Sequence, residues 1–202
     1  MGIDGPGGSG KSTLARQLSD GWPAAAVVEM DDFYRPSADR AEPPPVHGGN
    51  YDRERLTSQV LEPRASGRAG RYQRYDWEGD RLAEWHDVPA DAVVLVDGVY
   101  SLSALLREYF DYRIWVESSA DVRLQRGLDR DGEQMRDVWV QEWMPAEVRY
   151  RESERPEELA DLLLNGDGAK TGAVVFGVLA QDRASRSDGR SSAGRRRAAR
   201  RA

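Results

Sequence analysis

Short apolar runs that end in an acidic residue recur along this chain. Residues 24–30 are followed by Asp31, and residues 92–96 are followed by Asp97. Continuous apolar runs of this length are typical of parallel strands that are buried on both faces. Between the runs lie segments with helical spacing, such as 11–20. This alternation predicts an α/β fold with three αβα layers around a doubly wound, mainly parallel sheet.

The remaining apolar and polar positions predict the other elements. Residues 35–50 are rich in Pro and Gly and are expected to form a loop. Residues 71–88 are polar and aromatic, which favours a small β-excursion or lid rather than core. Further helices are predicted at 51–64, at 101–109, at 121–130 and from there to about 151, with strands at 112–116 and, last, at 162–164.

The first strand is shorter than the pattern requires. Met1–Asp4 can span only about 13 Å, whereas a strand usually has about five or six residues. We therefore hypothesise that the natural protein has further apolar residues upstream of Met1. The intact mass of the native protein would test this, and a mass that begins at Met1 would contradict it.

The most specific motif lies at residues 5–12, whose sequence GPGGSGKS matches G-x-x-x-x-G-K-[ST] in full. Glycines let consecutive N–H groups line one concave nest, and the following helix adds the positive end of its dipole. Lys11 supplies a charge for the β- and γ-phosphates, and the Ser12 hydroxyl can ligate Mg²⁺. A plain glycine-rich turn is disfavoured because the motif opens a helix. The predicted ATP-binding residues are Gly5, Gly7, Gly8, Ser9, Gly10, Lys11, Ser12 and Thr13.

Acidic residues at the two strand ends are candidates for metal binding and catalysis. Asp97 closes an apolar strand, so we expect it to hold Mg²⁺ together with Ser12, the alternative being a turn-capping role. Asp31 and Asp32 are adjacent, so on an extended backbone only one can face the phosphates. That one could accept a proton from an attacking hydroxyl. The residues alone do not choose between the two, or between this role and that of solvated loop acids.

Arginines and aromatic residues supply the other candidates. Arg123, Arg126 and Arg130 share one face of the predicted helix at 121–130 and could neutralise a moving phosphoryl group. The alternative is a solvated charged face. Tyr75 and Trp77 flank an acid in a polar segment, where their rings could stack on a flat ligand or form a satellite hydrophobic cluster.

The amino-acid composition restricts the class of protein and the compartment that we expect. The chain has 202 residues, no Cys and a net charge of −6, which suits one cytoplasmic domain without a disulfide framework. We expect no membrane segment or leader peptide. Residues 171–202 carry eight Arg and two Asp, so nucleic acid is an unexpected partner except through this basic tail. The predicted kinase domain is 1–168, followed by the tail 169–202, which we expect to be largely disordered from about 181.

These motifs together resemble the uridine kinase family, in the wider group with phosphoribulokinase, pantothenate kinase and nicotinamide riboside kinase. The likeness covers about residues 2–167. It rests on the motif at 5–12 with the residues after it, on Met30-Asp31-Asp32-Phe33-Tyr34, on Asn50-Tyr51-Asp52, on Tyr75-Asp76-Trp77 with Arg81, and on 123–131. One departure is Asp97-Gly98, where the family usually has Glu-Gly.

The resemblance implies a role for each of these segments. It selects Asp31 over Asp32 as the catalytic base and gives Asp52 the ribose hydroxyls. Tyr75, Trp77 and Arg81 then line the nucleoside pocket, and residues 123–131 form an arginine-bearing lid over ATP. Lys11, Arg126 and Arg130 complete the predicted catalytic set.

The predicted function is therefore Mg²⁺-dependent phosphoryl transfer from ATP to a primary hydroxyl of a ribonucleoside such as uridine or cytidine. Two alternatives stay open. One is the same transfer to another small alcohol, such as a sugar phosphate or a vitamin, and the other is a nucleotide-binding protein without turnover. The residues name neither the acceptor nor the oligomeric state, and a homo-oligomer remains compatible with them.

Overall fold

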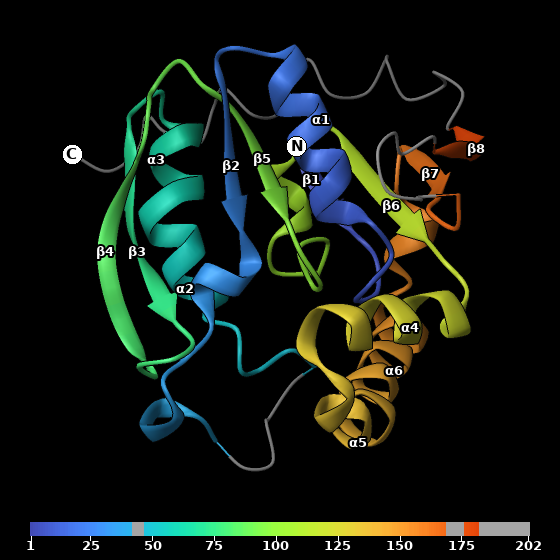
Figure 1. Ribbon diagram of the computed structural model, residues 1–202. Coiled ribbons are helices and arrows are strands. Elements are labelled where there is room, and N and C mark those ends of the chain that lie inside the picture. The colour runs from blue at the N-terminus through green and yellow to red at the C-terminus, as the bar shows by residue number, and fades with distance from the viewer. Residues whose placement is uncertain (42–46, 169–175, 182–202) are drawn as a thin grey trace.

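A computed structural model describes residues 1–41, 47–168 and 176–181. Within these ranges the chain forms one six-stranded sheet with helices on both faces and a separate two-stranded hairpin (Figure 1). This arrangement confirms the predicted three-layer α/β fold. The expectation of disorder concerns residues that, apart from Gln181, lie outside the described ranges.

The main sheet is mostly parallel. Its strands are β1 (Gly2–Asp4), β2 (Ala25–Glu29), β5 (Val93–Asp97), β6 (Arg113–Glu117), β7 (Leu162–Asn165) and β8 (Gly177–Gln181). Their order is β2-β5-β1-β6-β7-β8, and only β8 is antiparallel to its neighbour. The short β1 therefore lies between two longer strands, and the segment that follows it leaves from the middle of the sheet.

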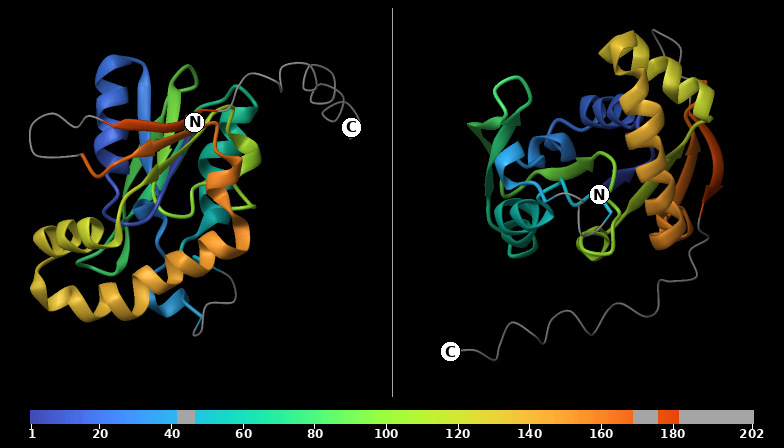
Figure 2. Two further views of the ribbon diagram at one scale, coloured as in Figure 1. Left: turned by 90° about the vertical axis from the view of Figure 1, so that its right-hand side faces the viewer. Right: turned by 90° about the horizontal axis from the view of Figure 1, so that it is seen from below.

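Two apolar layers explain why both faces of the sheet are covered. Ile3, Leu95 and Ile114 point to one face, where Leu14 of α1 (Lys11–Gly21) packs on them. Val96 and Trp115 point to the other face, into a larger cluster beneath the helices of that side. Figure 2 (left) shows α1 on one side of the sheet and the helix over 53–65 on the other. The alternation of side chains along each strand thus builds two cores from one sheet.

Two helical groups besides α1 each contain a π-helical turn. A continuous helical segment covers 53–65 and consists of α2 (Arg53–Leu56), a π-helical turn (Thr57–Leu61) and α3 (Glu62–Ala65). The second helical group consists of α4 (Ala120–Asp131), α5 (Arg136–Val138), a π-helical turn (Trp139–Trp143) and α6 (Met144–Glu154). In Figure 1 this second group lies below the carboxyl ends of the parallel strands.

The predicted β-excursion is confirmed as a hairpin. Strands β3 (Gly70–Asp76) and β4 (Arg81–Val88) pair in antiparallel fashion beside α2 and α3. Tyr72 and Val88 are buried and join the larger core, whereas Trp77 and Trp85 remain about half exposed. The hairpin therefore packs against the domain through these two buried side chains, and its turn extends toward the carboxyl ends of the parallel strands.

Two predicted elements differ from the structure. Residues 101–109 do not form a helix: they make a series of turns, with one 3₁₀ turn at Arg107–Tyr109. The backbone N–H of Ala104 donates to the distant Glu154 carboxylate, and those of Leu106 and Tyr109 donate to carbonyls three residues back, so the amides of this segment are not available to a regular α-helix. Strand β7 is also not the last strand, because the apolar residues of β8 pair with its edge.

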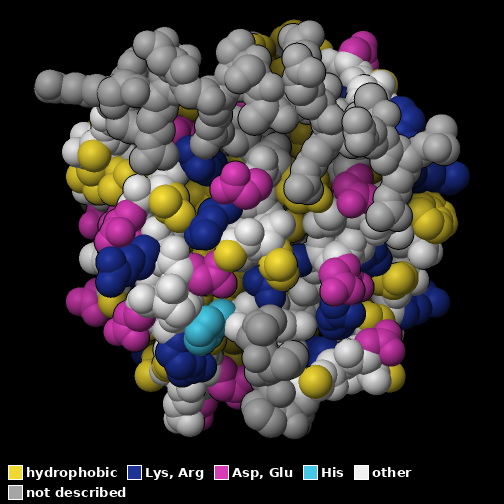
Figure 3. Space-filling view, turned by 180° about the vertical axis from the view of Figure 1, so that it is seen from behind, with side chains coloured by type: hydrophobic (Ala, Val, Ile, Leu, Met, Phe, Trp, Pro, Cys, Tyr) yellow, Lys and Arg dark blue, Asp and Glu magenta, His cyan; other side chains and the backbone are white. Residues whose placement is uncertain are grey.

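The surface carries charges of both signs. On the face shown in Figure 3, basic and acidic side chains are interspersed rather than gathered into one area of a single sign. Among the helices that the structure describes, none combines the length and the apolar character that a bilayer crossing requires.

Candidate active site

The phosphate-binding motif forms the loop between β1 and α1. Gly8 (φ +76°) and Gly10 (φ +103°) adopt left-handed conformations, and a Cβ on Gly8 would lie 2.6 Å from the backbone oxygen of Arg123. Glycine is therefore required at position 8 both for the backbone angle and for the close approach of α4. The Lys11 ammonium is buried and donates to the Pro6 carbonyl at 2.9 Å, so it lies directly over the loop.

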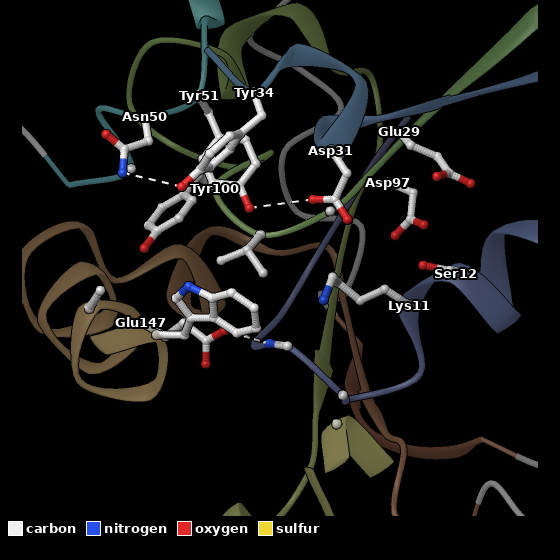
Figure 4. Close-up of a pocket in the computed structure, with 18 of the residues that line it drawn as sticks. Lys11, Ser12, Glu29, Asp31, Tyr34, Asn50, Tyr51, Asp97, Tyr100 and Glu147 are labelled. Carbon is white, nitrogen blue, oxygen red and sulfur yellow. Dashed lines mark hydrogen bonds between the residues drawn. The ribbon is translucent and has the colours of Figure 1, made fainter. Parts of the chain in front are cut away.

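Three carboxylates gather beside this loop. Strands β2 and β5 are parallel neighbours in a register that places Glu29 opposite Asp97, and Asp31 follows β2 by two residues. Figure 4 shows all three near Lys11 and Ser12. The pKa of Glu29 is raised by its burial and by the negative charges of Asp32, Asp97 and Asp31. This accumulation of negative charge favours a cation at the same edge of the sheet.

Asp97 has the chemistry of a magnesium ligand. It is buried, and one of its carboxylate oxygens has no hydrogen-bond partner among the described residues. Burial raises its pKa, an effect opposed by the charge of Lys11 and by a hydrogen bond from Ser12. A carboxylate and a hydroxyl are oxygen ligands that Mg²⁺ accepts. These residues therefore fit a Mg²⁺ ion, although the described residues contain no cluster of three or more His, Cys, Asp or Glu arranged as a metal cage.

The adjacent acids after β2 have different partners. The Asp31 carboxylate accepts a hydrogen bond from the Tyr51 hydroxyl at 3.3 Å and is otherwise open to the cleft. Asp32 accepts a hydrogen bond from the Tyr72 hydroxyl at 2.9 Å, on the hairpin side. Burial raises the pKa of Asp32, and the Tyr72 bond opposes the rise. Of the two, Asp31 is the one whose carboxylate is left free to meet a substrate hydroxyl.

A single cleft of about 1510 Å³ joins the loop to these acids. Sites for one small ligand usually measure about 300–1,000 Å³, so this cleft has room for a nucleotide and an acceptor side by side. Of the residues that the sequence predicts, the cleft is lined by Gly7, Gly8, Gly10, Lys11, Ser12, Thr13, Asp31, Tyr75, Trp77, Asp97, Arg126 and Arg130.

Aromatic rings form the wall opposite the loop. The Tyr34 ring lies 4.5 Å from the Trp77 ring and 5.1 Å from the Tyr51 ring, and the Tyr51 ring lies 5.5 Å from that of Tyr100. These rings come from four separate segments, and Asn50 adds a hydrogen bond to the Tyr34 hydroxyl at 3.3 Å. Tilted and edge-on rings of this kind offer aromatic surface on which a planar ligand could pack.

The lid arginines point in different directions. Arg126 donates to the Gly8 carbonyl at 3.1 Å and to the Gly166 carbonyl at 2.9 Å, so it packs against the phosphate-binding loop. Arg130 pairs with Asp131 at 2.7 Å on the cleft side. Arg123 instead donates to Glu147 at 2.7 Å and is buried. Two of the three arginines therefore remain candidates to meet a phosphate.

Four predicted residues do not line this cleft. Asp52 accepts from the Arg55 N–H at 3.0 Å as the N-cap of α2 and pairs with Arg35 at 3.1 Å. Arg81 is largely exposed and lies 3.6 Å from Asp76. Gly5 and Ser9 are buried on the protein side of the loop. The roles implied for Asp52 and Arg81 stay predictions.

Sequence reasoning missed several residues of the cleft. Tyr34 and Tyr51 belong to the segments that were singled out for their acids, so the same motifs contained the signal. Tyr100 and Glu29 follow or end apolar strands, a weaker signal. Glu147 accepts the Gly7 N–H at 2.8 Å from 140 positions away, and its own neighbourhood in the sequence carries no indication of this contact.

Comparison with known proteins identifies the family. The model of the phosphoribulokinase/uridine kinase family matches residues 46–138. The uridine kinase of Alkaliphilus metalliredigens is 32% identical over 143 residues, which cover 66% of this chain and 68% of that protein. The chain belongs to this family. A structure described as a possible uridine kinase from Bacillus stearothermophilus superposes with a TM-score of 0.60 at 25% identity, covering 80% of this chain and 85% of that one.

Other proteins similar to this chain are longer than it or carry a different name. The Arabidopsis thaliana inorganic pyrophosphatase TTM2 is 28% identical over 149 residues, which cover 68% of this chain but 21% of that protein. The chain spans 61% of the uridine kinase of Halobacterium salinarum. Family membership and the fold are thus shown.

Proposed function

We propose that this protein transfers the γ-phosphoryl group of Mg-ATP to a primary hydroxyl of a ribonucleoside-like small molecule, with uridine and cytidine as the first candidates. The observation that carries the proposal is the position of Asp31. Its carboxylate lies in the same cleft as Lys11 of the phosphate-binding loop and accepts a hydrogen bond from Tyr51 of the aromatic wall. Membership of the phosphoribulokinase/uridine kinase family supports the same reaction class.

In the proposed reaction, each group has one task. The loop amides and Lys11 hold the nucleotide phosphates, and Ser12 with Asp97 would hold Mg²⁺, which screens phosphate charge when bound. The acceptor oxygen bonds to the γ-phosphorus while the bond to the leaving oxygen of ADP breaks. Asp31 takes the hydroxyl proton and later returns it to solvent. Arg126 and Arg130, which line the cleft, would neutralise the transferred group.

The aromatic wall supports an acceptor that contains a flat ring. Tyr34, Tyr75 and Trp77 all line the cleft with their rings in contact, and the Tyr75 hydroxyl donates to Asp80 at 2.6 Å. A nucleobase could stack there, which would place its sugar toward Asp31. Transfer to a different small alcohol uses the same donor half of the site, and a screen of acceptors separates these alternatives.

The test is an ADP-release assay across acceptors, followed by Asp31→Asn with Asp32→Asn as the matched control. A positioned general base contributes about 10²–10⁴ in rate, so Asp31→Asn should lower turnover by about that factor and leave Mg-ATP affinity unchanged. Asp32→Asn alters an equally charged neighbour whose carboxylate is bound to Tyr72, and its turnover should stay within about threefold of the parent protein.

Two results would overturn the proposal. Equal turnover of Asp31→Asn and Asp32→Asn would remove Asp31 as the base. Tight Mg-ATP binding with no ADP release in the presence of any acceptor would favour a nucleotide-binding protein without turnover.

A further inference from the structure

A fully buried carboxylate lies directly beneath the phosphate-binding loop. Asp4 is the last residue of β1, immediately before Gly5, and none of its surface is exposed. It accepts four hydrogen bonds: from the backbone N–H of Gly5 at 2.7 Å, of Tyr100 at 3.2 Å and of Leu102 at 2.8 Å, and from the Tyr150 hydroxyl at 2.7 Å. An ionised carboxylate has about four acceptor positions, so the capacity of Asp4 is filled.

The four donors come from three segments that are distant in sequence. Gly5 begins the phosphate-binding loop, Tyr100 and Leu102 belong to the turn after β5, and Tyr150 lies in α6. Those segments carry three different parts of the site: the donor nucleotide's loop, the aromatic wall and the helix below the cleft. Asp4 is thus bonded to all three through one side chain.

Tyr100 adopts an unusual backbone conformation at this contact with Asp4. Its φ of +70° is left-handed, a conformation that a residue with a bulky side chain rarely adopts. The Asp4 carboxylate holds its N–H, while its ring packs edge-on to that of Tyr150 at 4.7 Å and against that of Tyr51 at 5.5 Å. The strained turn carries the Tyr100 ring into the cleft. Strain of this kind persists only where surrounding contacts maintain it.

Helix α6 contacts the loop at a second point. One turn before Tyr150, Glu147 accepts the Gly7 N–H at 2.8 Å with one oxygen and the Arg123 guanidinium at 2.7 Å with the other (Figure 4). Tyr150 therefore reaches the loop from the buried side through Asp4, and Glu147 reaches it from the cleft side. The same helix fixes the loop at both ends of Gly5–Gly7.

From these contacts we infer that Asp4 is a positioning residue for phosphoryl transfer, which holds the phosphate-binding loop, the Tyr100 wall and α6 at a fixed separation. The inference rests on the proposed function, because the separation matters only if the loop holds the phosphoryl donor and the wall holds the acceptor. Asp4 contacts neither substrate. It acts through Gly5, Tyr100 and Tyr150.

The cost of burying this group agrees with such a role. Burial raises the pKa of Asp4 to about 6, although hydrogen bonds from Tyr150, Leu102 and Gly5 and the charge of Lys11 all act to lower it. An apolar residue at the end of β1 would avoid this desolvation but would leave four donors, three backbone N–H groups and one hydroxyl, without a partner. The carboxylate is therefore the group that can satisfy donors from all three segments at once.

The experiment compares Tyr150→Phe and Asp4→Asn with Asp161→Asn. Tyr150→Phe removes one hydroxyl from Asp4 and keeps the ring. Asp161 also accepts several hydrogen bonds, from the N–H and guanidinium of Arg113, but it lies at the opposite end of β6 and does not line the cleft. It is thus a control for the loss of a partly buried carboxylate away from the site.

Turnover and hydrogen exchange are both measured on the folded proteins. In Tyr150→Phe, kcat should fall about tenfold while the Mg-ATP dissociation constant changes less than about threefold, because misplacement weakens alignment more than binding. Asp4→Asn should lower kcat further. The double variant that combines Asp4→Asn with Tyr150→Phe should lower kcat no more than Asp4→Asn alone. Amide exchange should quicken about tenfold in both Gly5–Lys11 and Tyr100–Leu102, whereas Asp161→Asn should change neither segment.

The outcomes separate the two proposals. If the parent protein turns over no acceptor, the proposed function fails, and the exchange measurement alone decides whether Asp4 joins the loop to the wall. If Tyr150→Phe keeps the parent kcat and the parent exchange rates, Asp4 is not a positioning residue. Additive losses in the double variant would overturn the inference in the same way.

Discussion

Substitution of Gly166 by Ala offers a direct test of how the phosphate-binding loop is supported. Gly166 follows β7 and is buried against the loop. A Cβ built on it would overlap the carbonyl oxygen of Ser9 and stand 3.1 Å from the Val116 side chain. Its φ lies outside the left-handed region, so alanine is compatible with the backbone and the overlap is the only penalty.

The geometry sets the size of the effect. Neither side of the overlap yields easily, because Ser9 contributes a backbone atom and the Gly166 N–H is bonded to the Glu117 carbonyl at 2.7 Å. Relief requires the loop to move by on the order of 1 Å, and a misplacement of that size can cost about 10² in rate. Overpacking also lowers the free energy of unfolding by about 1–3 kcal/mol.

The assay combines denaturant unfolding with turnover measured at saturating Mg-ATP. Gly166→Ala should lower the free energy of unfolding by about 1–3 kcal/mol and lower kcat by about 10². Gly21→Ala is the matched control, because nothing lies within 4 Å of a Cβ at this last residue of α1. It should leave kcat unchanged. Destabilisation of Gly166→Ala without any loss of kcat would refute the claim that this contact positions the loop.

Three further predictions concern charge and stacking. Because burial raises the pKa of Asp4 from 3.8 to about 6, the folded protein binds a proton more tightly than the unfolded chain between these values. The free energy of unfolding should therefore fall by about 2–3 kcal/mol as pH rises from about 4 to about 6, and urea titrations should find no such step in Asp4→Asn. Asp97→Ala should weaken ATP binding about tenfold or more in the presence of Mg²⁺ and little in EDTA; equal effects in both conditions would exclude Asp97 as a ligand. Trp77→Ala should raise the acceptor KM about 10-fold or more with the ATP KM unchanged, and an unchanged acceptor KM would place the acceptor elsewhere.

Much of the donor half of the site could be predicted from the sequence, because its determinants are local. A glycine-rich loop needs residues that tolerate left-handed angles, and Gly8 and Gly10 adopt such angles in the structure. The apolar runs at β2 and β5 form parallel strands, as predicted, and they bring Asp31 and Asp97 to one end of the sheet; β2 is an edge strand, however, in which only Val28 is buried. The roles of these acids in binding and catalysis remain predictions that the experiments above address.

The predicted helix at 101–109 shows where local reasoning ends. Its apolar spacing is compatible with a helix, but the N–H groups of Tyr100 and Leu102 donate to Asp4, almost a hundred positions earlier. Amides at the start of a helix have no helical partner in any case, but the Ala104 amide inside the segment also donates to a distant carboxylate, that of Glu154, and the Leu106 and Tyr109 amides donate to carbonyls only three residues back. The choice is made by a tertiary contact that no window of sequence contains.

The contacts that join the phosphate-binding loop to the aromatic wall and to α6 are also tertiary contacts between distant parts of the chain. The sequence by itself determined the phosphate-binding loop, the strands β2, β5, β6 and β7 and the identity of the acids at the strand ends, since each follows from neighbours in the chain. Only the tertiary structure decided that Asp4 binds Tyr150 and that Glu147 binds the Gly7 amide. Hydrogen bonds between segments this far apart depend on where folding places the donors, and that placement is a property of the whole packed domain.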